Sequence, residues 1–100
     1  MFEPNKPIFM TRFISKELSQ EHQQFIIQYI IEHHQLLTDY LQVFDFYPIN
    51  NQQWLLQRQE QPNRETIHIV RLKDTEAIEL KVWVMDQGSE GIIILFPEDY

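Results

Sequence analysis

The segment from Ser19 to Leu37, SQEHQQFIIQYIIEHHQLL, is the one stretch of this sequence that is long and periodic enough to predict a full amphipathic helix. At about 100° per residue, its apolar side chains cover an arc of about 240°. They are Phe25, Ile26, Ile27, Tyr29, Ile30, Ile31, Leu36 and Leu37. A helix that covers a single sheet needs an apolar stripe of only about 100°. We therefore expect this helix to bury two flanks.

The second flank of this helix is a candidate seam for a homodimer. Ile27 and Ile31 lie at the edge of the apolar arc nearest the polar stripe, so these two side chains are the natural contact residues of such a seam. The start of the helix is also predicted locally. Ser19 is a plausible N-cap, and Glu21 lies in the first turn, where the helix dipole favours an anion.

Six short segments read as strands because aromatic and branched side chains dominate them or alternate along them. They are residues 8–13, 41–48, 52–59, 66–72, 78–85 and 92–96. The last five are joined by short turns, which favour antiparallel neighbours because parallel pairs need long crossovers. We therefore expect an α+β fold in which one main helix packs on a curved antiparallel sheet of five to six strands, a two-layer sandwich in meander order.

The chain length and composition predict one domain over residues 1–100. The chain has 100 residues, of which 43% are hydrophobic, and this is enough to form a core without disulfides or a structural metal. Residues 1–7, with Pro4 and Pro7, are expected to be a flexible leader, and residues 97–100 an acidic tail. The sequence has no cysteine, no apolar run of membrane-spanning length and no signal-peptide pattern. We expect a cytoplasmic protein that makes no membrane contact.

The net charge of −7 is concentrated at one end of the sequence. Residues 74–100 hold seven acids and a single base, Lys81, and so carry six of the seven net negative charges. Direct nucleic-acid binding is disfavoured, because it requires a cationic footprint. The acids either form a solvated surface that aids solubility or form a docking face for a basic protein. The candidate contact residues are Asp74, Glu76, Glu79, Asp86, Glu90, Glu98 and Asp99.

Catalytic and metal-binding patterns are weak in this sequence. His22 and His33 lie eleven positions apart, and the adjacent His33 and His34 diverge by about 100° on a helix, so no zinc pair at i and i+4 is present. Ser89 lies in G-S-E-G rather than in the G-x-S-x-G order of a nucleophile elbow. We expect no metal, no cofactor and no enzyme activity, and the open alternative is a small enzyme that uses a carboxylate with His33 or His68.

Aromatic side chains on the expected strands could instead form a stacking platform for single-stranded nucleic acid. They are Phe44, Phe46, Tyr47, Trp54 and Trp83. Such platforms carry lysines and arginines between the rings, whereas here Arg58 and Lys81 are interleaved with Asp45 and Glu79. Core packing is the better explanation of most of these rings.

Two motifs, DYLQVFDF at residues 39–46 and QRQEQP at residues 57–62, give the sequence a family resemblance. Together with Thr11-Arg12, the amphipathic helix and the Glu98-Asp99-Tyr100 ending, they resemble the small bacterial proteins grouped as domain of unknown function 960. The resemblance implies a compact α+β fold and a setting in low-GC Gram-positive bacteria, often on phages or other mobile elements. It implies no activity and no site residues.

The leading functional hypothesis is a non-enzymatic, acidic protein-binding module. In the mobile-element setting, its partner would be a basic protein surface such as the nucleic-acid channel of a host enzyme, as for inhibitors of the anti-CRISPR or anti-restriction type. The alternatives are the structural or regulatory homodimer that uses Ile27 and Ile31, and the small enzyme.

Overall fold

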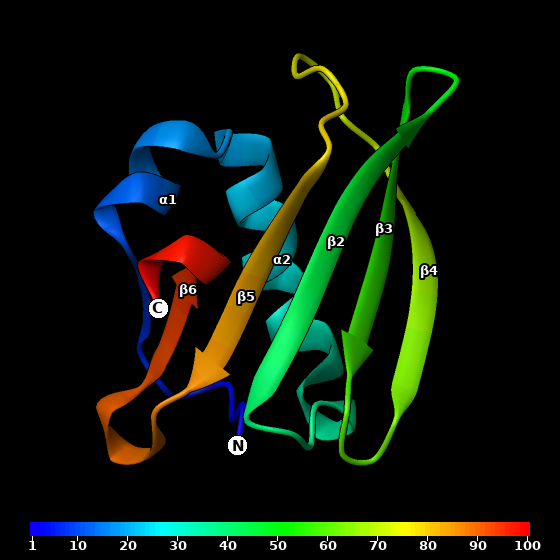
Figure 1. Ribbon diagram of the computed structural model, residues 1–100. Coiled ribbons are helices and arrows are strands. Elements are labelled where there is room, and N and C mark those ends of the chain that lie inside the picture. Colours follow the sequence, from blue (N-terminus) through cyan, green and yellow to red (C-terminus); the bar gives the residue numbers. More distant parts are fainter.

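Two layers make up the protein: helices cover one face of a six-stranded sheet in the computed structural model, which describes residues 1–100 (Figure 1). The strands are β1 (Ile8–Met10), β2 (Leu41–Ile49), β3 (Gln52–Gln59), β4 (Arg64–Val70), β5 (Leu80–Asp86) and β6 (Ile92–Leu95). The α-helices are α1 (Arg12–Glu17) and α2 (Gln20–His33), and the short 3-10 helices are η1 (His34–Leu36), η2 (Gly88–Glu90) and η3 (Pro97–Asp99). The expected α+β sandwich with one main helix is confirmed. Neither helix has the length and apolar character needed to cross a membrane.

The sheet has the order β1-β6-β5-β2-β3-β4 and is mixed rather than purely antiparallel. Strands β2, β3 and β4 form the expected consecutive hairpins, but β5 crosses back to pair with β2, and β1 runs parallel to β6. The return of β5 places Val82 beside Phe44 on the helix-facing side, where both are fully buried. Most of the chain separates β1 from β6, so turn lengths did not constrain their direction.

The start of α2 is fixed by the predicted cap. The Ser19 hydroxyl oxygen accepts a hydrogen bond from the backbone N–H of His22 at 3.1 Å, as an N-cap side chain does. From there Ile26, Tyr29 and Ile30 are buried against the sheet. The cap therefore fixes the residue at which α2 begins.

The second apolar flank of α2 is covered mainly by the chain itself. Phe2, Ile14 and Leu18 belong to the same buried cluster as the core residues of α2, and Ile27 packs against that cluster. Ile31, by contrast, is 42% exposed. Part of the wide apolar arc is therefore buried in a core cluster that also contains residues of the N-terminal segment and α1.

Both ends of the chain are held against the body of the molecule. Residues 1–7 were expected to be a flexible leader, but they pack against the rest of the protein. Phe2 is only 1% exposed, and the backbone N–H of Ile92 donates to the Pro7 carbonyl at 2.9 Å. The acidic tail forms η3, and the Tyr100 ring meets Trp83 edge-on with 5.9 Å between centroids. The buried Phe2 side chain anchors this segment to the core, although the nearby prolines had indicated a segment without regular structure.

Candidate functional site

The seven candidate carboxylates are divided between the two ends of β5. Asp74, Glu76 and Glu79 precede the strand, whereas Asp86 ends it and Glu90 follows in η2. A seven-residue strand is about 23 Å long at 3.3 Å per residue. The acidic residues therefore do not form one continuous face.

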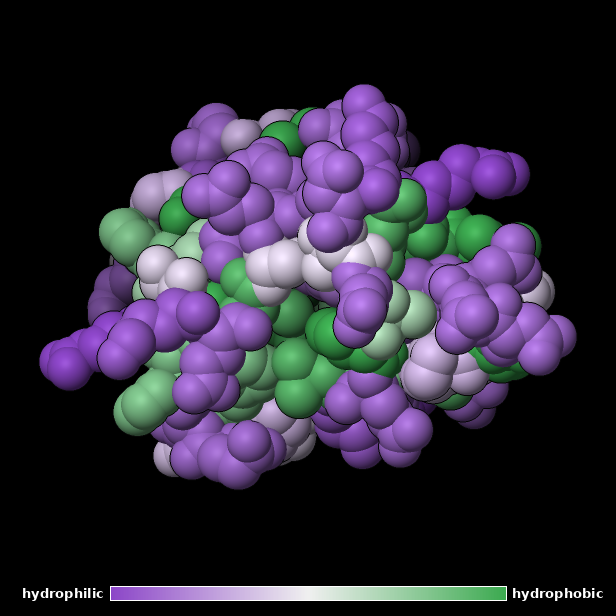
Figure 2. Space-filling view, turned by 90° about the horizontal axis from the view of Figure 1, so that it is seen from above, coloured by the Kyte–Doolittle hydropathy of each residue, from purple (hydrophilic) through white to green (hydrophobic).

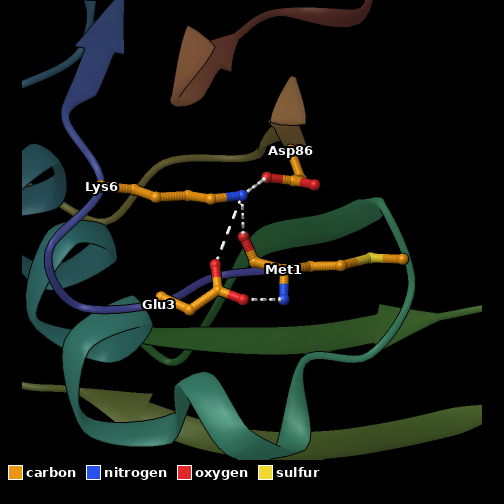
Figure 3. A network of polar contacts seen from close by, with 4 residues as sticks. All are labelled: Met1, Glu3, Lys6 and Asp86. Carbon is orange, nitrogen blue, oxygen red and sulfur yellow. Dashed lines mark hydrogen bonds and ion pairs between the residues drawn. The ribbon is translucent and has the colours of Figure 1, made fainter. Parts of the chain in front are cut away.

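Asp86 is occupied by an ion pair with the N-terminal segment (Figure 3). The Lys6 ammonium lies 2.5 Å from Asp86 Oδ1, and this hydrogen bond raises the pKa of Lys6. Lys6 also donates to the Met1 carbonyl at 2.8 Å and lies 3.3 Å from Glu3. The N-terminal ammonium, as the main cause, lowers the pKa of Glu3 to about 2. Asp86 thus helps to hold residues 1–7 in place.

Asp99 is likewise engaged within the chain. Its Oδ2 atom accepts hydrogen bonds from the Thr11 hydroxyl at 2.9 Å and from the backbone N–H of Phe96 at 3.1 Å. Its neighbour Glu98 is exposed and makes no hydrogen bond or ion pair. Of the two acids in the tail, only Glu98 is free to meet another molecule.

Glu79 and Glu98 come together with Glu17 of α1 around an open pocket of about 320 Å³. The rest of its lining is apolar and comes from Ile78, Leu80 and Phe96, with no basic residue among the lining side chains. Glu17 is not among the contact residues predicted from the sequence, because only the fold brings the end of α1 next to the start of β5. We refer to Glu17, Glu79 and Glu98 as the glutamate pocket.

This end of the molecule combines polar and apolar surface. Figure 2 looks down on the end that is uppermost in Figure 1, where hydrophobic residues lie in a central depression bordered by hydrophilic side chains. A second open pocket, of about 800 Å³, is lined by residues of the β2–β3 turn, the end of β4 and the β4–β5 loop, including Arg71 and Glu76. Acid and base occur together there, so it is less strongly acidic than the glutamate pocket.

The β4–β5 loop that carries Asp74 and Glu76 is tied to the first turn of α2. Glu21 Oε2 accepts from the backbone N–H of Lys73 at 2.8 Å, and Glu21 Oε1 accepts from that of Asp74 at 2.8 Å. The hydrogen bond from Asp74, followed by the one from Lys73, lowers the pKa of Glu21. The acidic loop is therefore positioned by a side chain of α2.

His33 and His68 both pack against the Tyr29 ring. The rings of Tyr29 and His33 stack at 4.1 Å between centroids, and His68 meets Tyr29 edge-on at 5.2 Å. Burial lowers the pKa of His68, and the positive charges of His33 and Arg64 add to the effect. Neither His33 nor His68 lines any of the three main pockets. Both rings therefore have packing roles beside Tyr29.

His22 is buried and makes a hydrogen bond to Gln53 of β3. Gln53 Oε1 accepts from the backbone N–H of Ile78 at 2.8 Å, and Gln53 Nε2 lies within hydrogen-bond distance of three backbone carbonyls, which fixes the orientation of this amide. The 2.9 Å contact between His22 Nε2 and Gln53 Oε1 then requires a proton on Nε2. His22 links the start of α2 to the start of β5 as a structural residue.

The residues that carry the family resemblance form a buried amide network. Gln57 Nε2 donates to Gln42 Oε1 at 2.8 Å, and Gln42 Nε2 donates to Gln59 Oε1 at 2.7 Å. Gln59 also donates to the Pro62 carbonyl, while Asp39 Oδ2 accepts from the backbone N–H of Gln61. Residues 39–46 and 57–62 are thereby given structural roles. Their polar side chains join β2, β3 and the adjacent turns.

The aromatic residues of the strands divide between the two faces of the sheet. Phe44 and Phe46 are buried under α2, which confirms core packing for these rings. Tyr47, Trp54 and Trp83 are half-buried on the opposite face, which neither α1 nor α2 covers (Figure 1). On that face Asp45 lies 3.5 Å from Arg58 and 3.9 Å from Lys81, so the bases there are partly neutralised.

The fold places this chain among two-layer α+β proteins with a mixed six-stranded sheet. A solved structure described as a protein of unknown function from Enterococcus faecalis is similar, with a TM-score of 0.80. The match has 17% sequence identity and covers 99% of this chain and 94% of the other. At this identity, the likeness shows the fold alone. No protein-family model and no curated protein matches the sequence.

Proposed function

We propose that this protein is a non-enzymatic protein-binding module that uses the glutamate pocket to hold a basic side chain of a partner protein. The observation that carries the proposal is the convergence of Glu17, Glu79 and Glu98 on an apolar floor. A lysine or arginine can lay its hydrocarbon stem on apolar surface while its charged head reaches carboxylates. Arginine would gain most, because its planar head can meet a carboxylate with two hydrogen bonds.

The remaining exposed acids at this end extend the site. Asp74 and Glu76 lie on the loop that Glu21 anchors, so their positions are held relative to α2. Charges around the pocket would steer a basic partner and increase its association rate. Glu90 lies at the other end of β5, and Asp86 and Asp99 have internal partners, so these three contribute less.

The narrower hypothesis is an inhibitor of a host nucleic-acid-binding enzyme, of the anti-CRISPR or anti-restriction type. Its support is the small size of the protein, its net charge of −7 and the resemblance to domain of unknown function 960. In this version the glutamate pocket would occupy part of a cationic channel. The purified partner should then lose nucleic-acid binding when this protein is added.

Affinity capture from a bacterial lysate with charge-reversed baits tests the proposal. The wild-type bait should retain a basic protein, identified by mass spectrometry, and retention should weaken as salt rises. The double variant Glu79→Lys/Glu98→Lys should lose that protein. A matched bait, Glu60→Lys/Glu90→Lys, has the same net charge but changes exposed acids away from the pocket, and it should keep the partner.

Each bait is first checked by circular dichroism, so that loss of capture is not loss of fold. Equal retention by both double variants would contradict the assignment of the glutamate pocket. Loss with both would show that net charge alone governs binding.

A further inference from the structure

Strand β4 is an open edge of the sheet (Figure 1). Its residues pair with β3 in an unbroken register from Arg64 to Val70. No other segment of the chain forms a hydrogen bond with the backbone of these residues. The strand contains no proline, lysine or bulge, the devices that usually protect a sheet edge from pairing with another chain.

The β2–β3 hairpin determines which backbone groups of β4 point outward. Asn50 and Asn51, with φ of 50° and 66°, form a two-residue turn that closes Ile49 and Gln52 as a hydrogen-bonded pair. Because hydrogen bonding alternates along antiparallel strands, the even-numbered residues of β3 bond to β2 and the odd-numbered ones to β4. The odd residues of β3 face even residues of β4. The outward backbone groups of β4 therefore belong to Glu65, Ile67 and Ile69.

The side chains of the same residues add an apolar contact surface beside this edge. Ile67 is 61% exposed and Ile69 is 42% exposed, and both lie on the sheet face that α2 does not cover. Ile67 and Ile69 therefore carry both outward backbone groups and exposed apolar side chains. An added strand would satisfy the former and bury the latter.

The local charge of β4 allows two copies of this acidic chain to approach along it. Residues 64–71 carry two arginines, Arg64 and Arg71, and a single acid, Glu65, whereas the whole chain has a net charge of −7. Of the acidic residues around β5, Glu79, Asp86 and Glu90 lie on the other side of β2 and β3 in the sheet order, whereas Asp74 and Glu76 follow β4 on the β4–β5 loop. Self-repulsion is therefore smaller along β4 than around β5.

We propose that two copies of this chain associate through antiparallel pairing of their β4 strands, about a two-fold axis at His68. In this register Ile67 lies opposite Ile69 of the second copy, so the four isoleucines of the pair form one cluster. Glu65 lies opposite Arg71 of the second copy at each end. Ile67 and Ile69 both have outward backbone groups, so these pairs can exchange hydrogen bonds, whereas Arg71 lies one residue beyond β4 and contributes its charge.

Charge selects this register over the neighbouring one. An axis at Ile67 also matches the outward hydrogen-bonding groups, but it places Glu65 opposite Ile69 of the second copy. The axis at His68 gives two opposite-charge pairs and keeps the isoleucines together. The interface is isologous, as a two-fold dimer requires. It is separate from the glutamate pocket and leaves that pocket open.

Sedimentation equilibrium from about 10 μM to about 1 mM tests the proposal. The wild type should shift from monomer to dimer mass across this range. Ile67→Pro removes an outward N–H and should give a monomer that stays folded, because proline is tolerated at a sheet edge. Ile67→Lys provides a second variant that keeps the N–H but places charge in the isoleucine cluster.

Exchange of the end charges tests the register. Arg71→Glu should weaken the dimer about tenfold, because two like-charge contacts are created at once. The double variant Glu65→Arg/Arg71→Glu should restore it. Ile31→Lys, on the exposed part of α2, is the matched control and should leave association unchanged.

A wild type that stays monomeric at about 1 mM would overturn the proposal. So would a dimer that persists in both Ile67 variants, and sensitivity to Ile31→Lys alone would assign the contact to α2. Failure of the charge exchange to restore the dimer would reject the register centred on His68.

Discussion

Asp99 Oδ2 accepts a hydrogen bond from the hydroxyl of Thr11 at 2.9 Å, which joins two positions 88 residues apart in the chain. Thr11 is also the N-cap of α1, where its hydroxyl oxygen accepts from the backbone N–H of Ile14 at 3.2 Å. The carboxylate therefore orients the hydroxyl that caps α1. Asp99 Oδ2 also accepts a hydrogen bond from the backbone N–H of Phe96, so this carboxylate holds the start of η3 as well.

Asp99 and Glu98 are adjacent acids with different expected roles. Asp99→Ala should lower the free energy of unfolding by about 1–2 kcal/mol, because it removes a charge-assisted hydrogen bond and leaves the cap less ordered. Glu98→Ala should change it by less than about 0.5 kcal/mol, because this side chain is exposed. Urea unfolding of the two variants measures the difference. Equal effects would contradict the structural role of Asp99.

The buried amide network should be sensitive to removal of a single glutamine. Gln57 donates to Gln42, and its own oxygen accepts from the Tyr29 hydroxyl at 3.5 Å. Gln57→Leu keeps the approximate volume but leaves Gln42 Oε1 without a donor, which should cost about 1–3 kcal/mol. Gln28→Leu, on the exposed side of α2, is the control and should stay within about 0.5 kcal/mol of the wild type. Thermal and urea unfolding should both show that Gln57→Leu is less stable than Gln28→Leu.

Local signals in the sequence account for the confirmed parts of the fold. Ser19 followed by an amphipathic pattern predicted the start of α2, and alternation along residues 78–85 predicted β5. Both depend on side chains within a few positions of each other. The parallel pairing of β1 with β6 depends instead on contacts such as Ile8 with Ile92, which no local pattern encodes.

The candidate site was less accessible to sequence reasoning. The charge pattern indicated Glu79 and Glu98 but did not distinguish them from Asp86 and Asp99, each of which has a side-chain partner among the first eleven residues. Glu17 belongs to a near-neutral part of the sequence and joins the pocket only through the fold. The glutamines of β3 alternate with Trp54, Leu56 and Arg58, and such alternation identifies two faces of a strand but not which face is buried. Their hydrogen bonds allow a polar face to lie under α2.

Acid should weaken the connection between α2 and the β4–β5 loop. Hydrogen bonds from the backbone N–H groups of Asp74 and Lys73 lower the pKa of Glu21 below its ordinary value of 4.5. The charged form is favoured in the folded protein, so its stabilisation is present above about pH 4.5 and is lost as pH falls through the lower, folded pKa. Glu21→Gln should therefore destabilise the protein near neutral pH and flatten the acid limb of its stability curve. A curve parallel to that of the wild type below about pH 4.5 would contradict this linkage.

His68 should make stability depend on pH in a higher range. Burial, reinforced by the charges of His33 and Arg64, lowers the pKa of His68 below its ordinary value of 6.5. The unfolded chain then takes up the proton first as pH falls, so stability is complete above about pH 6.5 and is lost through the folded pKa. A ring-proton NMR titration should give His68 a midpoint below 6.5. His68→Gln should reduce the loss of stability on acidification below that value. A midpoint at or above 6.5 would mean that the ring is charged without penalty beside Tyr29, and the variant would then keep the pH dependence of the wild type.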